Sequence, residues 1–168
     1  MNSEQIKRQN VKYKQPLFQY EIYPLKSKSS HLDAGPSHWH TEFEVCYCIS
    51  GSVIYKTAKR EYKLNPGDIV FVNADVIHSV ITVNPADDLH MSVHFIDDSF
   101  ISGGRGNAFD VEYVFPIKDN ENIDMILFAG NSPRTEIVRT LIAENIQIKK
   151  KKDKFWEFRI RNNISHFW

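Results

Sequence analysis

The sequence predicts one mainly β domain, a sandwich or barrel of short strands, followed by two α-helices. Runs of β-forming residues separated by turn residues fill the chain from Leu17 to about Phe115, at the spacing of such a domain. After Phe115 the apolar residues recur at helical intervals. With 168 residues, 42% of them hydrophobic, the chain can bury a core without disulfides, and it has no apolar run long enough to cross a bilayer.

The β-forming runs have the lengths of ordinary strands, and glycine, proline, asparagine and aspartate separate them. These residue types supply the fixed or positive φ angles that tight turns need. The predicted turns are Ser50-Gly51-Ser52, Asn65-Pro66-Gly67-Asp68, Asn73-Ala74-Asp75 and Asn84-Pro85-Ala86-Asp87. The predicted strands are Phe18–Tyr23, Phe43–Ser50, Val53–Thr57, Glu61–Leu64, Ile69–Asn73, His78–Val83, Leu89–Ile96 and Val111–Phe115.

The first predicted helix begins at Ser132, a helix-capping residue that is followed by Pro133. Glu136 lies in its first turn, where the helix dipole favours a carboxylate. Apolar residues continue at i, i+4 intervals to the lysine run 149–152, which we interpret as a solvated helix end rather than a nucleic-acid patch.

In the second predicted helix Trp156, Ile160, Ile164 and Trp168 recur every fourth residue and form one wide apolar face. This face either packs on the barrel of the same chain or serves as a dimer interface anchored by large aromatics. The sequence stops on Trp168 in the middle of the stripe, without a capping glycine or a proline, so we expect the natural protein to continue.

The charge balance argues against DNA binding by this chain alone. Lysine plus arginine and aspartate plus glutamate each number 21, so no overall positive field attracts a phosphate backbone. Cys46 and Cys48 are expected to be reduced, buried thiols, with thiolate ligation as the less favoured alternative. The polar N-terminus carries no secretion signal, which favours a cytoplasmic protein without membrane association.

Four potential metal ligands stand at suggestive intervals. His38 and His40 alternate along a strand and project from one face, and Glu44 lies an even number of positions further along. His78 arrives on a later strand and can complete the set from a neighbouring wall of a closed barrel. Imidazole and carboxylate suit zinc, nickel, iron, manganese or copper. The alternative is a wet effector pocket, because dry and unpaired burial of these groups is costly.

The spacing H-x-H, three residues, E, six residues, G resembles the first motif of the cupin family. Gly67 and His78 keep the separation of the second motif, whereas Asn73 and Asp75 replace its usual proline and glycine, and Thr82 replaces its final asparagine. The resemblance spans about Ser37 to Thr82 and implies a double-stranded β-helix, or jelly-roll, barrel. It places the metal ligands of cupins at His38, His40, Glu44 and His78.

A closer resemblance is to the N-terminal sensor domain of AraC-type bacterial transcription regulators. The segment HWHTEFEVCYCISGSVIYKTAKREYKLNPGDIVFVNADVIHSV carries it, as does Val93-His94-Phe95 leading into Asp97-Asp98-Ser99-Phe100 before two helices. The resemblance implies a barrel that binds a small effector, often a sugar, an N-terminal arm able to fold over the barrel mouth, and helices that mediate dimerisation. In that family DNA is bound by a C-terminal domain with two helix-turn-helix units, which this sequence lacks.

We therefore predict an N-terminal arm (1–16), a cupin-like effector-binding barrel (17–118) and a helical dimerisation segment (119–168) that stops before a DNA-binding domain. The predicted function is non-enzymatic: the chain senses a small molecule, a sugar being one candidate, and forms a homodimer. No cofactor is required, although a divalent transition metal at the four cupin positions is an open alternative. The predicted effector-binding residues are His38, His40, Glu44, His78 and His94, and the predicted dimer contacts are Trp156, Ile160, Ile164 and Trp168.

Two other functions stay open. One is a small metal-dependent cupin enzyme, a dioxygenase or isomerase, that uses His38, His40, Glu44 and His78. The other is a carbohydrate-binding module.

The sequence leaves three further orientations unsettled. His90, Ser92 and His94 form one polar strand face, which lines either the pocket or the solvent. Trp39 packs between the sheets or at the barrel mouth, and Glu42 lines the pocket or its rim.

Overall fold

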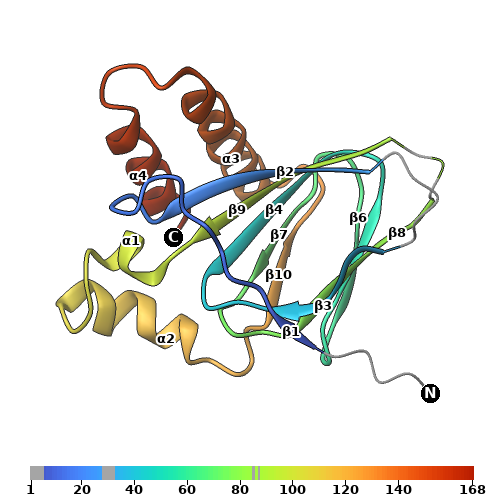
Figure 1. The fold of residues 1–168 in the computed structure, drawn as a ribbon, viewed down its shortest axis with the longest axis horizontal. Coiled ribbons are helices and arrows are strands. Elements are labelled where there is room, and N and C mark those ends of the chain that lie inside the picture. Colours follow the sequence, from blue (N-terminus) through green and yellow to red (C-terminus); the bar gives the residue numbers. More distant parts are fainter. Residues whose placement is uncertain (1–5, 28–32, 85, 87) are drawn as a thin grey trace.

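The computed structural model describes residues 6–27, 33–84, 86 and 88–168, and it confirms the predicted fold class. Two five-stranded β-sheets face each other to form the barrel, and helices cover one side of it (Figure 1). The first five residues of the predicted arm, and Pro85 and Asp87 of the fourth predicted turn, lie outside the described residues.

The two sheets have the strand orders β1-β3-β8-β5-β6 and β10-β7-β4-β9-β2. All pairs are antiparallel except β1 with β3, which is parallel. The strands of the first sheet are β1 (Lys7–Arg8), β3 (Asp33–Trp39), β5 (Val53–Lys56), β6 (Glu61–Leu64) and β8 (His78–Thr82). Those of the second sheet are β2 (Tyr20–Ser27), β4 (Phe43–Ser50), β7 (Ile69–Val72), β9 (Leu89–Ile96) and β10 (Met125–Phe128).

The predicted strand Val111–Phe115 is wrong. This segment forms the π-helix η1 (Asp110–Val114) and the start of α2 (Phe115–Lys118). The side chain of Asn107 accepts a hydrogen bond of 3.0 Å from the backbone N–H of Asp110, which starts a helical turn. The alternating apolar residues Val111 and Tyr113 are 57% and 54% exposed, so they do not form the inner face of a strand.

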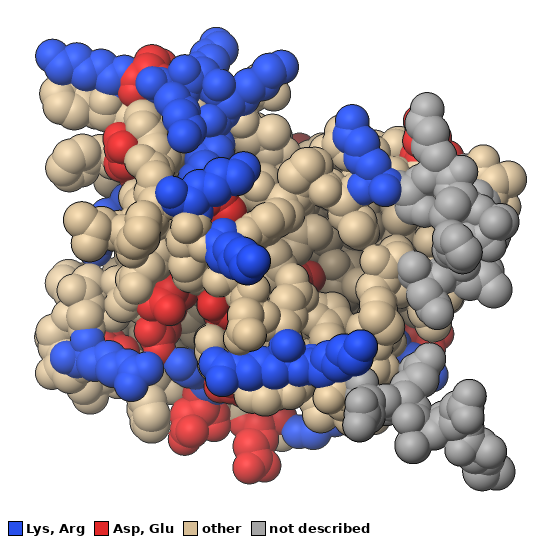
Figure 2. All heavy atoms as spheres, in the orientation of Figure 1, with Lys and Arg blue, Asp and Glu red and all other residues tan. Residues whose placement is uncertain are grey.

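The helices α1 (Asp98–Ser102), α3 (Pro133–Lys151) and α4 (Trp156–Phe167) complete the fold. The side chain of Ser132 accepts a hydrogen bond from the Thr135 N–H, as the predicted cap requires, and α3 ends at Lys152 in the left-handed conformation. Lysine and arginine side chains gather at the corner where α3 meets α4 (Figure 2). No helix among the described residues is long and apolar enough to span a membrane.

The second sheet lies between two apolar clusters, which bury most of both its faces. One cluster lies inside the barrel, between the two sheets, and the other lies between the second sheet and helices α3 and α4. The barrel cluster includes Cys46, Cys48, Tyr55, Val72 and Met91. The helix-side cluster includes Tyr20, Phe43, Val45, Phe71 and Ile96.

The apolar face of α4 belongs to this helix-side cluster. Trp156, Ile160 and Ile164 are 6%, 0% and 1% exposed within the single chain. Trp168 packs its ring on Phe43, with centroids 4.9 Å apart. The structure thus favours packing on the chain's own barrel, and these three buried side chains are not available to a second copy. Homodimerisation itself stays a prediction.

The described part of the N-terminal arm lies against the barrel. Strand β1 runs parallel to the end of β3, and Gln9 N–H donates a hydrogen bond of 2.8 Å to the carbonyl of Trp39. The guanidinium of Arg8 stacks over the Trp39 ring at 5.3 Å, and the Tyr13 hydroxyl donates to Glu42 at 3.3 Å. Trp39 and Glu42 are therefore covered by the arm.

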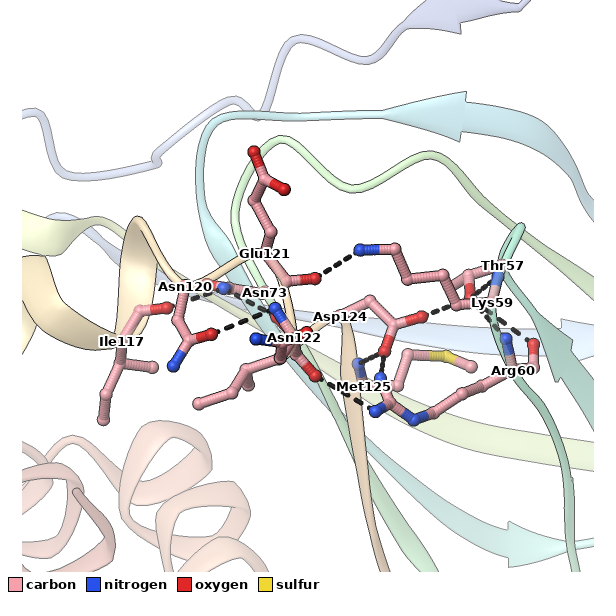
Figure 3. A network of polar contacts seen from close by, with 11 residues as sticks. Thr57, Lys59, Arg60, Asn73, Ile117, Asn120, Glu121, Asn122, Asp124 and Met125 are labelled. Carbon is pink, nitrogen blue, oxygen red and sulfur yellow. Dashed lines mark hydrogen bonds and ion pairs between the residues drawn. The ribbon is translucent and has the colours of Figure 1, made fainter.

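Strand β10 was not predicted, and it lies within the 119–168 segment that we expected to be helical. It extends the second sheet by pairing with β7. A polar network holds the chain that enters it (Figure 3): Asp124 pairs with Arg60, and its carboxylate accepts hydrogen bonds from the Thr57 hydroxyl (2.5 Å) and the Met125 N–H (2.9 Å). This network ties the edge of one sheet to the other.

Replacing Asp124 by asparagine is expected to destabilise the protein by about 2 kcal/mol, because a buried carboxylate with several donors contributes more than an exposed ion pair. The matched control is Glu61→Gln, which breaks the exposed Lys56–Glu61 pair and should cost less than about 0.5 kcal/mol. Urea unfolding measures the stability loss of each variant from the shift of its midpoint, provided that the m-value is unchanged. Equal midpoints for the two variants would show that the network contributes no stability.

Candidate metal centre in the barrel

The four residues that the spacing singled out meet inside the barrel. His38 on β3 lies directly opposite His78 on β8, in the antiparallel register of the first sheet. His40 follows the end of β3, and Glu44 enters from β4 of the facing sheet. One ligand atom from each residue lies within 4.8 Å of all the others. Both sheets therefore contribute to a single cluster of donors.

The cluster is sheltered from water on most sides. His40, Glu44 and His78 are 1%, 2% and 1% exposed, whereas His38 is half-buried. The imidazole rings of His38 and His78 are 4.3 Å apart between centroids, and those of His40 and His78 are 5.2 Å apart. His38 is therefore the member of the cluster that is most exposed to solvent.

Backbone carbonyls fix the orientation of all three imidazoles. The Nδ1 atoms of His38, His40 and His78 lie 2.7, 3.0 and 2.9 Å from the carbonyl oxygens of Pro36, Glu42 and Val76. A carbonyl only accepts, so each Nδ1 carries the proton. In a neutral ring the lone pair then lies on Nε2, which is the tautomer that metal-ligating histidines present.

The Nε2 lone pairs point toward a carboxylate, and this arrangement requires a positive charge. Glu44 Oε2 lies 3.1 Å from Nε2 of His40 and 3.5 Å from Nε2 of His78. Without a shared proton or a cation these would be contacts between acceptors. The Nε2 atom of His78 is buried and has no hydrogen-bond partner among the described residues.

The pKa shifts reflect the same pairing. Burial alone would raise the pKa of Glu44, but the hydrogen bond with His40 and the close imidazoles of His40 and His78 outweigh burial and hold the pKa well below its ordinary value. Burial alone would lower the pKa of His78, but its contacts with Glu44 outweigh burial and raise it. Burial and the neighbouring His78 lower the pKa of His38. The site thus favours one positive charge beside Glu44.

Tyr55 is a member of the site that the sequence did not reveal. Its hydroxyl donates a hydrogen bond of 2.9 Å to Glu44 Oε1, the oxygen that the imidazoles leave free. Tyr55 stands on β5, whose pairing with β8 brings it into the barrel, and sequence parity along one strand gives no sign of that pairing. This contact fixes the carboxylate as the carbonyls fix the imidazoles.

His94 does not join the site, contrary to the prediction. It pairs directly with Val45 across β9 and β4, so both side chains share the face that packs on the helices. Its Nδ1 lies 2.5 Å from the Tyr20 hydroxyl, and its Nε2 lies 3.0 Å from the Ser92 hydroxyl. The polar face of β9 thus faces the helices rather than the barrel interior, and there His94 is hydrogen-bonded to Tyr20 and Ser92.

The cysteines lie inside the barrel, as the alternation predicts, and both are fully buried. Burial and the charge of Glu44 raise the pKa of the Cys46 thiol well above its ordinary value. Burial also raises the pKa of Cys48, to about 11. Neutral thiols are poor metal ligands, so these residues act as small apolar side chains.

The residues present fit a divalent transition metal. Three imidazoles with preset Nε2 lone pairs and one carboxylate form a donor set that suits zinc, iron, manganese, nickel or copper. A cation among them would satisfy the orphaned His78 Nε2 and neutralise Glu44. His38, His40, Glu44 and His78 would hold it, supported by the three carbonyls and Tyr55.

Comparison with known proteins finds one matching family model and several similar folds. Residues 26–96 match the family model of the AraC-like ligand binding domain. No curated protein matches the chain. Crystal structures of ToxT from Vibrio cholerae are similar: one with a methylnaphthalenyl butenoic acid bound has a TM-score of 0.58 at 17% identity, covering 89% of this chain and 55% of that chain.

Two further ToxT structures agree. An apo variant gives a TM-score of 0.56 at 11% identity, covering 89% of this chain and 54% of that one. The unsaturated fatty acid bound form gives 0.55 at 15% identity, covering 88% and 52%. At these identities the likeness shows the fold alone. This chain spans about half the length of the ToxT chains that it matches.

Proposed function

We propose that the chain is the effector-sensing part of an AraC-type transcription regulator, because residues 26–96 match the family model of the AraC-like ligand binding domain. The observation that carries the proposal is the enclosed cluster of His38, His40, Glu44 and His78 within that domain. Imidazole and carboxylate groups recognise hydroxyl and carboxyl groups of small molecules directly or through a metal ion. The chain acts by binding rather than by catalysis.

Effector binding is linked to the N-terminal arm. The arm contacts Trp39 and Glu42, which flank His40 along the chain, so a ligand that displaces these residues changes how the arm is held. A coupling free energy of about 1–3 kcal/mol suffices for regulation. In the complete regulator this coupling would reach DNA through a separate helix-turn-helix domain, and the working form would be a cytoplasmic homodimer.

Two classes of effector deserve testing. Sugars offer adjacent hydroxyl groups to the imidazoles and Glu44. Carboxylic acids are the second class, because the similar ToxT structures contain an unsaturated fatty acid and an aryl butenoic acid.

The test is a thermal-shift screen of pentoses, hexoses and short carboxylic acids, followed by hydrogen exchange. A true effector raises the unfolding temperature of the wild type but not of His38→Ala, and it changes amide exchange in residues 6–16. A compound that binds the barrel without altering exchange in the arm or DNA affinity of the complete regulator would contradict the sensing role.

We propose further that the four-residue cluster holds a divalent transition metal. When bound, the ion supplies Lewis-acid coordination for an oxygen of the effector. Replacing His40 by alanine removes a buried ligand and is expected to weaken Co²⁺ binding by at least about 100-fold. Loss of a residue that only supports a ligand weakens metal binding by about 10–100-fold, so loss of a ligand itself should cost at least as much. Cobalt absorption spectra and elemental analysis of protein purified without added metal measure the change.

The matched control for metal binding is His90→Ala, which removes a half-buried histidine on β9 outside the cluster and should retain wild-type affinity. Equal metal content in wild type and both variants would exclude the proposed centre. Effector sensing would survive that result, because the imidazoles could still contact a ligand directly.

A metal-dependent cupin enzyme is the second candidate, and the same donor set favours it. The two functions differ in what happens to a bound small molecule. An enzyme converts it, with turnover lost in His40→Ala, whereas a sensor returns it unchanged and alters DNA binding by the complete protein.

A further inference from the structure

A cavity of about 560 Å³ lies outside the barrel, on the side of the second sheet opposite the histidine cluster. Its floor is the outer face of β7 and β10, and its walls are the first turns of α3 and the end of α4. The volume falls within the range of ordinary ligand pockets. None of the four cluster residues lines it, so it is a separate place for a ligand.

The cavity is apolar because β10 alternates. Met125 and Leu127 point into the barrel cluster, so Ile126 and Phe128 point outward into the cavity. Ile126 and Ile137 are 40% and 49% exposed, which leaves large apolar side chains in contact with water. The floor and walls include Phe71, Ile126, Phe128, Ile137, Phe167 and Trp168.

A free arginine stands in this apolar wall. Arg134 lines the cavity, and no hydrogen bond or ion pair engages its guanidinium among the described residues. Arg139, on the same helix, is by contrast held by Glu136 and by the carbonyls of Gly67 and Gly130. His166 is the other basic residue of the lining, which contains no acidic residue. The cavity therefore combines apolar area with uncompensated positive charge.

We propose that this cavity binds an apolar monocarboxylate, a fatty or aryl carboxylic acid. Its carboxylate pairs with Arg134, whose guanidinium suits bidentate contact, and its apolar body lies against Phe71, Phe128 and Trp168. A sugar fits poorly, because the lining offers few polar side chains for its hydroxyl groups. The proposal goes beyond effector sensing in the barrel, since it concerns another ligand site with its own chemistry.

The first test compares decanoate with 1-decanol by titration calorimetry below their aggregation limits. Decanoate should bind the wild type more tightly than decanol, and Arg134→Gln should weaken decanoate binding about tenfold while leaving decanol unchanged. The matched control is Lys150→Gln, an exposed cation at the other end of α3, which should retain wild-type affinity for both probes.

The second test locates the bound molecule. Ile137→Glu places a negative charge at a half-exposed position of the lining, so the fold should survive while decanoate binding falls below detection. Decanoate should shift the NMR signals of the Trp168 indole and Ile126, but not those of Tyr55 in the barrel. Shifts confined to Tyr55 and its neighbours would place the carboxylate in the effector chamber instead and overturn the proposal.

Two other outcomes would also overturn it. Equal affinity for decanoate and decanol, unaffected by Arg134→Gln, would show that the cavity does not select a carboxylate. A dimer that Ile137→Glu converts to monomer, with no effect of decanoate, would show that a second copy of the chain covers this surface. Neither outcome bears on the barrel site, because His38, His40, Glu44 and His78 are unchanged in both variants.

Discussion

The wild type is expected to lose about 3–5 kcal/mol of folding stability in acid through protonation of His94, and replacing His94 by glutamine is expected to abolish this loss. Burial lowers the pKa of His94 from 6.5 to about 3 in the folded protein. The neutral ring makes hydrogen bonds with the hydroxyls of both Tyr20 and Ser92. One ring nitrogen donates to one of these hydroxyls, and the other nitrogen accepts from the second hydroxyl. A second proton would place an uncompensated charge in the helix-side cluster.

The direction of the pH dependence follows from proton uptake at His94, because the unfolded chain takes up this proton more readily than the folded chain. Below the unfolded pKa of about 6.5 the unfolded chain binds a proton at His94 that the folded chain refuses until pH about 3. Stability therefore falls as the pH is lowered through this window. At about 1.4 kcal/mol per pKa unit, the full shift corresponds to about 3–5 kcal/mol below pH 3.

Urea unfolding at a series of pH values measures this effect. The wild type should lose stability steeply from pH 6.5 downward, and His94→Gln should give a flatter profile while keeping hydrogen bonds to Tyr20 and Ser92. The loss of the Glu44 interaction in acid affects both proteins alike. His90→Gln, on the same strand but half-buried, is the control and should keep the wild-type profile. Parallel profiles for wild type and His94→Gln would contradict the assignment.

Replacing Trp156 by alanine is expected to cost about 3–5 kcal/mol of folding stability. Its ring is 6% exposed, contacts Phe18 edge-on at a centroid distance of 4.9 Å, and lies under the Lys149 ammonium at 5.0 Å. All these partners belong to the same chain. The loss should therefore appear as a lower unfolding midpoint at every protein concentration.

The control for Trp156 is Phe158→Ala, on the same helix. Phe158 is 67% exposed, so its removal should cost less than about 1 kcal/mol. Sedimentation of the two variants distinguishes a core role from an interface role. A Trp156→Ala protein that keeps wild-type stability but changes from dimer to monomer would restore the dimerisation role that the sequence suggested for this face.

The sequence predicts the barrel well because its strands obey local rules. Phe43–Ser50, Glu61–Leu64 and Leu89–Ile96 are bounded by turn residues, and their limits match the structure residue for residue. Alternation also places Glu44 and Cys46 on one face, since parity within one strand needs no knowledge of its neighbours.

Parity between strands is what the sequence does not contain. His94 shares a face with Val45 only because β9 and β4 pair in one register, and a shift of one residue would have turned it into the barrel. A sheet buried on both sides offers no solvent face to reveal the register. The same limit hid Tyr55, whose place depends on how β5 pairs with β8.

Local pattern misleads where apolar residues alternate without a sheet partner. Val111 and Tyr113 look like a strand, yet the Asn107 cap starts a helix there. Met125–Phe128 is the opposite case, because this short apolar run becomes a strand only through its pairing with β7. Both errors come from tertiary context that overrides local preference.

The first sheet ends in charged strands, and this bears on how the protein behaves at high concentration. Its two edges are β1, made of the exposed Lys7 and Arg8, and β6, whose Glu61 and Lys63 are also exposed. Short, charged border strands repel further backbone pairing. Edge-to-edge aggregation is therefore opposed at both borders of this sheet, and the N-terminal residues that touch the barrel also protect its solubility.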